Sequence, residues 1–213
     1  MDVKLLLDQF LGEGASTPGT DTNRAAKRGA AGGLAVGGML GLMMGSKKVR
    51  KKARKAAKYG GAAALGALAY RAYQNYQTDQ SAPHIPEDRF LPSAAPSADG
   101  QPFELALVLA MISAANADGH IGPDEQRVIF ERVGESDLEA LEKGFVFDAL
   151  SDPPGLNDVA ALATGVEQAT ELYMVSRMAI DVDHPAEVAY LEALAARLQL
   201  PRELVNQIDQ EVG

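Results

Sequence analysis

The sequence predicts an all-α protein, and three observations lead to that fold class. Apolar residues recur with helical spacing, and no segment shows the sustained alternation that is typical of a strand. Prolines stand where helices would begin, and acidic residues often follow in the first turn. The charge is also divided, because residues 1–80 carry 13 Lys/Arg against 5 Asp/Glu and residues 81–213 carry 7 against 24. We therefore expect a basic N-terminal arm and an acidic helical body.

The first 23 residues predict a short amphipathic helix followed by a loop. Within Met1–Leu11, the apolar residues Val3, Leu6, Leu7 and Phe10 share one side of a helix. The uninterrupted apolar run there is too short for a secretory signal peptide. Residues 12–23 are rich in Gly, Thr and Pro, which favours a loop.

Residues 24–78 predict a membrane-associated helical region rich in Gly and Ala. Residues 29–46 form an 18-residue stretch without a charge, close to the roughly 20 apolar residues that a transmembrane helix needs. Glycine recurs every fourth residue, which places a stripe of small residues on one helix face for close helix–helix packing or self-association. The stripe consists of Gly29, Gly33, Gly37, Gly41 and Gly45. The alternative is a pair of soluble Ala/Gly helices.

A basic run follows, and its expected partner is an anionic lipid headgroup. Each basic residue near such a surface contributes roughly 1 kcal/mol. The run lacks interleaved aromatic residues, so we expect no nucleic-acid partner. Its basic members are Lys47, Lys48, Arg50, Lys51, Lys52, Arg54, Lys55 and Lys58.

A second stretch of small residues, 59–70, is too short to span a bilayer alone. It predicts half of a hairpin or an interfacial helix. A single span at 29–46 would leave the acidic body cytoplasmic because basic residues favour that side, whereas two spans would reverse the orientation.

Residues 79–101 predict a Pro-rich linker that is extended and has no core. The helical domain is expected over 102–213. Its helices are predicted at 103–117, from Pro123, from a Ser136 cap to about Leu150, from an Asn157 cap, at 166–180, from Pro185 to Leu200, and from Pro201 onward.

Two stretches of this domain, 114–133 and 178–198, share a pattern: an apolar helix, an acidic loop containing His, a Pro and then an amphipathic helix. Oxygen ligands at this spacing suit Ca²⁺, Mg²⁺ or Mn²⁺. The candidate ligands are Asp118, Glu125, Asp181, Asp183 and Glu187. The alternative is that these carboxylates cap helices and shape turns. An EF-hand is excluded, because Ala114 occupies the position where that loop requires a carboxylate.

Catalysis finds little support in the sequence. The chain has no cysteine, and it contains neither a phosphate-binding loop nor a G-x-S-x-G or H-E-x-x-H motif. We therefore expect no catalytic residues and a non-enzymatic protein. A carboxylate-based, metal-dependent hydrolase is the third and weakest hypothesis.

The stretches NADGHIGPDEQRVIFERV and DVDHPAEVAYLEALAARLQLP resemble the TerB-like domain of tellurite-resistance proteins. The whole layout, from residue 24 to 212, is similar to the YebE-type inner-membrane family of uncharacterised function. The resemblance implies a bundle of about seven helices with an acidic surface for metal cations, where Asp118, Glu125, Asp181 and Glu187 match. It also implies an inner-membrane location with the TerB-like domain in the cytoplasm.

The expected function is that of a membrane-anchored, non-enzymatic stress-response scaffold. Its acidic domain would bind a divalent cation or a protein partner. The alternative is a soluble, self-associating interaction module that binds no metal.

Overall fold

A computed structural model describes residues 1–11, 61–80, 82–117, 138–180 and 184–212, and a few single positions between them. Within these residues the protein has eight α-helices, one short 3₁₀-helix and no strand, which confirms the all-α class. The elements are α1 (Val3–Leu11), α5 (Gly61–Gln80), η2 (Glu87–Phe90), α6 (Phe103–Ala115), α8 (Ala140–Ser151), α9 (Leu156–Ala160), α10 (Val166–Met178), α11 (Pro185–Arg197) and α12 (Arg202–Val212).

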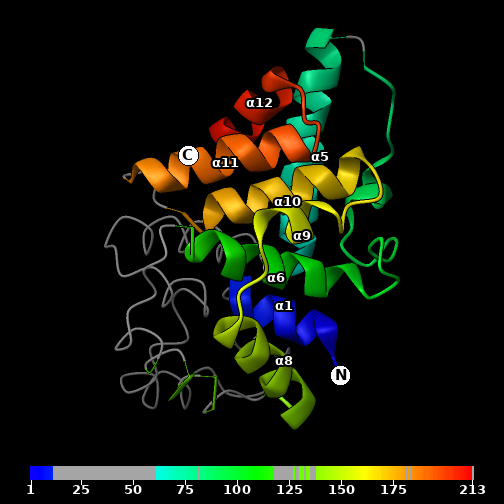
Figure 1. Ribbon diagram of the computed structural model, residues 1–213. Helices are drawn as coiled ribbons and strands as arrows, with labels where there is room; N and C mark the ends of the chain where they lie inside the picture. Colours follow the sequence, from blue (N-terminus) through cyan, green and yellow to red (C-terminus); the bar gives the residue numbers. More distant parts are fainter. Residues whose placement is uncertain are drawn as a thin grey trace, which may run out of the picture.

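Helix α10 forms the centre of the described body. Every residue from 168 to 176 is buried, so this helix is covered on all sides. It packs against α6, α5, α12 and α11. Figure 1 shows α6, α10 and α11 stacked side by side, with α5 crossing them. A helix this fully enclosed fixes the position of its neighbours, and two of them form the candidate site.

The short N-terminal helix predicted within Met1–Leu11 is present as α1, and it belongs to the body. Leu6, Leu7 and Phe10 are completely buried against α5 and α6. Two hydrogen bonds hold its ends: the Asp2 amide donates to Glu142 of α8, and Asp8 accepts from the Ala62 amide at 2.9 Å. The Asp8 carboxylate thereby satisfies one of the free amides in the first turn of α5.

The second small-residue run, predicted as half of a hairpin or an interfacial helix, is helical and packs within the body. From Gly61 onward it forms α5, whose small residues pack against α1, α10 and α12. A Cβ atom at Gly66 would lie 2.2 Å from the Phe90 carbonyl oxygen, so the missing side chain permits a close backbone approach within the body. None of the described helices is long and apolar enough to cross a membrane. The predicted Gly29–Gly45 stripe lies outside the described residues.

Residues 82–102, here called the strap, are built into the body rather than forming the predicted coreless linker. Phe90 is fully buried, with its ring 5.6 Å from that of Tyr70 and 5.4 Å from that of Tyr73. The Tyr73 hydroxyl donates to the Pro83 carbonyl at 2.9 Å. The segment is not extended throughout, since it contains η2 and turns closed by the Ala94 and Gly100 amides, and the buried Phe90 ring holds it in place.

Helix starts in the C-terminal half agree in part with the prediction. Pro185 is the first residue of α11, as predicted. Asn157, predicted as a cap, lies inside α9, where Asp158 accepts from the Gly155 amide instead. Helix α8 begins after Glu139, whose amide donates to Glu142 at 2.7 Å, while the predicted cap Ser136 is outside the described residues.

Candidate functional site

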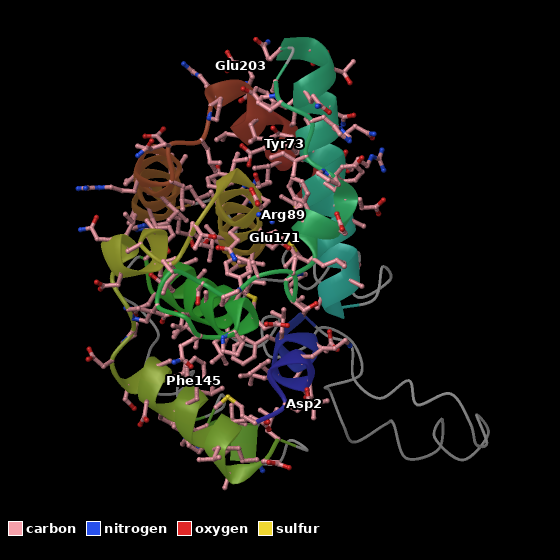
Figure 2. The ribbon with its side chains drawn as sticks, turned by 90° about the vertical axis from the view of Figure 1, so that its right-hand side faces the viewer. Asp2, Tyr73, Arg89, Phe145, Glu171 and Glu203 are labelled. Carbon is pink, nitrogen blue, oxygen red and sulfur yellow. The ribbon has the colours of Figure 1, made fainter. Side chains whose placement is uncertain are left out.

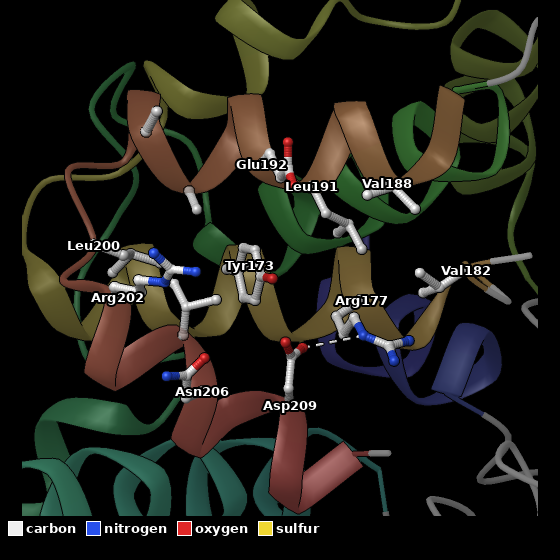
Figure 3. Close-up of a pocket in the computed structure, with 13 residues that line it drawn as sticks. Tyr173, Arg177, Val182, Val188, Leu191, Glu192, Leu200, Arg202, Asn206 and Asp209 are labelled. Carbon is white, nitrogen blue, oxygen red and sulfur yellow. Dashed lines mark hydrogen bonds and ion pairs between the residues drawn. The ribbon is translucent and has the colours of Figure 1, made fainter. Parts of the chain in front are cut away.

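An open groove lies between α11 and α12, with α10 as its floor (Figure 3). Its volume is about 600 Å³, within the range of roughly 300–1,000 Å³ that is typical of ligand sites. The lining residues are Tyr173, Arg177, Val182, Val188, Leu191, Glu192, Ala195, Ala196, Leu200, Arg202, Val205, Asn206 and Asp209. This groove is the strongest candidate for a binding site among the described residues.

The α11 wall of the groove is largely apolar. Val188, Leu191 and Ala195 recur at a spacing of three and four residues and therefore share one face of α11. Leu191 is buried, whereas Val188 is 38% exposed, a large fraction for an apolar side chain. An apolar stripe that reaches solvent in this way is typical of a contact surface.

The α12 wall is largely polar because the apolar face of α12 is turned into the core. Helix α12 directs Leu204 and Ile208 into the core, where both are fully buried, and it packs against α5 and α10. The remaining face carries the polar residues Arg202, Asn206 and Asp209 along the groove, together with the apolar Val205. The chain turns between α11 and α12 at Gln199, which has φ 55°, so the two helices diverge from a tight, left-handed connection.

Tyr173 and Arg177 of the floor and Asp209 of the α12 wall form the polar centre of the groove (Figure 3). The Arg177 Nε donates to Asp209 at 3.1 Å, and its guanidinium also bonds the Ile180 carbonyl at 3.4 Å. Burial, followed by the nearby Asp209 charge, raises the pKa of the Tyr173 hydroxyl to about 12. That hydroxyl therefore stays protonated at neutral pH and remains a hydrogen-bond donor.

This composition suits non-covalent binding. The residues that line the groove include no Ser, Cys, Lys or His, so they offer no nucleophile–base pair of the usual kind. They offer an apolar stripe, a protonated phenol and an ion pair that is only partly exposed. Such a surface can recognise an amphipathic partner.

Comparison with known proteins places the chain in a family. Residues 29–212 match "Protein of unknown function (DUF533)". The chain belongs to the DUF533 family. It is also 33% identical over 106 residues to an "Uncharacterized protein in ampR 5'region" of Yersinia enterocolitica, which covers 50% of this chain and 76% of that relative. No solved structure matches. The DUF533 family name states no function, and the TerB-like and YebE-type resemblances remain predictions.

Of the predicted cation ligands, the structure describes Glu187 in this DUF533 chain. Its carboxylate accepts from the His184 amide at 3.1 Å, and the His184 Nδ1 accepts from the Ala186 amide at 3.2 Å. The two residues thus cap the start of α11 in the manner of a capping box. The other candidates, Asp118, Glu125, Asp181 and Asp183, lie outside the described residues. Within the described part, no group of three or more His, Asp or Glu side chains could hold a metal ion.

The groove was not predicted, although one signal for it was present. Arg177 is the basic residue in the last turn of a helix that is otherwise enclosed. Its side chain is mostly buried, and a buried arginine normally requires an acidic partner. Asp209 lies 32 residues away, so the pair depends on how α10 and α12 pack. Sequence spacing alone does not reveal that packing.

Proposed function

We propose that this DUF533 chain is a non-enzymatic binding module whose groove takes an amphipathic helix of a partner protein. The observation that supports this most directly is the apolar stripe on α11 facing the divergent wall of α12 across about 600 Å³ of open space. Binding a helix by its apolar face in a groove between two helices is a recurring mode of recognition. The partner helix would place its apolar side chains over Tyr173 and Leu191.

The charges favour a basic partner helix. Outside residues 12–60 the chain carries 27 Asp/Glu against 9 Lys/Arg, a net charge of −18. Such an excess attracts a basic partner and speeds its encounter. Glu192 on the rim carries a negative charge, while Arg177 is neutralised by Asp209. Arg202, at the first residue of α12, would face the carboxyl-terminal end of the bound helix, where the helix dipole is negative.

The membrane part of the proposal concerns the residues between α1 and α5. We propose that the basic run at 47–58 contacts anionic lipid headgroups and holds the acidic body near the inner membrane. Leu11 and Gly61, the described residues on either side of 12–60, line the same small void.

Binding of designed peptides to the full chain tests the groove. The first peptide is a basic amphipathic helix, the second keeps its apolar face but carries acidic residues, and the third scrambles the apolar face. We expect saturable binding of the basic peptide, binding of the acidic peptide weaker by about tenfold or more, and no saturable binding of the scrambled one.

Two matched variants assign the binding to the groove. Val188→Asp places a charge on the apolar wall and should abolish binding of the basic peptide. Leu141→Asp makes the same kind of change on α8, where Leu141 is 69% exposed, and should leave binding unchanged. If the scrambled peptide bound as tightly as the basic amphipathic peptide, binding would depend on net charge alone, and the proposal would be overturned. Self-association of the chain without peptide, abolished by Val188→Asp, would identify a second copy as the occupant and overturn it as well.

A further inference from the structure

Glu171 is a buried carboxyl group without a described partner, at the centre of the bundle (Figure 2). Its side chain is completely buried on α10, and neither carboxylate oxygen accepts a hydrogen bond from any described residue. Leaving such a group ionised and unpaired in a protein interior is costly. Burial, followed by the charges of Glu167 and Glu104, raises the pKa of this carboxyl well above its ordinary value of 4.5.

The strap is fastened to α10 within one turn of Glu171. Arg89 forms an ion pair with Glu167 at 2.7 Å, and the Gln168 side chain donates to the carbonyls of Ala95 and Pro96, both at 3.1 Å. The Ala98 amide donates to the Leu162 carbonyl just before α10 begins, at 2.9 Å. These contacts therefore lie toward the same end of α10 as the unpaired carboxyl, while Phe90 and Pro83 hold the strap to α5.

The charges around Glu171 do not compensate it. Helix α10 contributes Glu167, and α6 contributes the buried Glu104, both of which are acidic. The strap contributes Arg89, whose guanidinium is already bonded to Glu167. Helix α5 contributes Tyr73 near Glu167, and the hydroxyl of Tyr73 is bonded to the strap. Among the described residues, no cation bonds the Glu171 carboxyl.

We propose that Glu171 is a pH-sensitive device that loosens the strap from α10 when its carboxyl group ionises. An ionised Glu171 must reach water or a cation, and it must also repel the ionised Glu167 that holds Arg89. Of the segments packed on α10, the strap is the one with little regular structure, since it contains only the four-residue η2. Few side chains of the strap are buried, among them Phe90 and Ser97, whereas α6 is buried along nearly its whole length, so displacing the strap uncovers less apolar surface than displacing that helix.

The direction of the pH effect follows from the raised pKa. The folded protein holds the Glu171 proton more tightly than the unfolded chain does, so this contribution to stability is complete below pH 4.5. It is lost progressively as the pH rises through the folded-state pKa. The strap is thus held most firmly under acidic conditions and released as the pH rises.

Hydrogen exchange and thermal unfolding of the full chain test whether ionisation of Glu171 loosens the strap. Protection of the Ala98 amide, corrected for intrinsic exchange, should fall with rising pH by up to about tenfold per pH unit, because one proton is released on opening. In Glu171→Gln and in the apolar Glu171→Leu this pH dependence should disappear. At neutral pH at least one of the two variants should melt several degrees higher than the parent chain. Glu203→Gln, the same change at an exposed site on α12 outside the groove, should behave like the parent.

Two results would overturn the proposal that ionisation of Glu171 loosens the strap. One is an Ala98 protection profile that depends on pH equally in the parent chain and in both Glu171 variants. The other is a lower melting temperature of both variants at neutral pH, since that would show a favourable role for the ionised carboxylate. Neither readout depends on the α11–α12 groove, so the outcome is independent of the proposed peptide binding.

Discussion

Two helix junctions lie beside the central helix α10, and they differ in how completely they are filled. Where α1 meets α5, the void lined by Leu11, Gly61 and Met178 measures about 10 Å³. Where α11 faces α12, the open space measures about 600 Å³. Both junctions contain small residues, so the small residues alone do not decide which junction closes.

The filled junction closes because α1 itself supplies large apolar side chains. Helix α1 inserts Leu7 and Phe10 against α5, and Asp8 binds the Ala62 amide at the start of α5. At the open junction, the large apolar side chains of α12, Leu204 and Ile208, are directed away into the core. The comparison teaches that the groove is open because the apolar face of α12 is already used elsewhere, which leaves a polar wall opposite an apolar one.

The largest expected effect comes from emptying the filled junction. Phe10→Ala should lower the free energy of unfolding by about 3–5 kcal/mol, because it removes a completely buried ring and leaves a cavity. Denaturant unfolding of the full chain measures it. Leu141→Ala, at an exposed position, is the control and should change stability little. A small effect of Phe10→Ala would show that α1 does not seal this junction.

The next largest effect comes from Gly66, where α5 approaches the strap. In Gly66→Ala the new Cβ would lie 2.2 Å from the Phe90 carbonyl oxygen, which is a backbone atom, so a shift of the chain is required. We expect a loss of about 1–3 kcal/mol. Gly144→Ala on α8 is the matched control, since nothing lies within 4 Å of its Cβ, and it should stabilise the chain by about 0.5–1 kcal/mol. Equal effects of the two substitutions on thermal unfolding would contradict the close approach.

Much of the fold could be predicted from the sequence, because helical periodicity and capping are local. The helix near the N-terminus, the buried helix at 166–178 and the Pro185 start of α11 all follow from residues a few positions apart. The strap and α5 could not be placed in the same way. Their composition favours a linker and a membrane element, and it does not reveal that the strap and α5 pack on each other through Phe90, Tyr70 and Gly66.

The candidate site was less predictable than the fold, because its residues come from three helices. Tyr173, Arg177 and Asp209 have no motif in common, and their proximity depends on the packing of α10 and α12. Glu187 illustrates the converse problem, since a carboxylate in a first helical turn suits a cap as well as a ligand, and in the described structure it is a cap. The acidic loops at 118–125 and 181–183 lie largely outside the described residues, so the cation hypothesis stays a prediction.

The smallest expected effect is at the open junction itself. Val188→Ser should change the free energy of unfolding by less than about 0.5 kcal/mol, because Val188 is 38% exposed and the space beside it is open. The same substitution should weaken binding of the basic amphipathic peptide. Thermal unfolding and peptide titration of one sample would separate the effect on stability from the effect on binding. A loss of stability comparable to that of Phe10→Ala would mean that α11 needs this side chain for packing. Stability that is insensitive to Val188, combined with binding that depends on it, is the behaviour expected of a residue whose contacts are made with a partner rather than with its own chain.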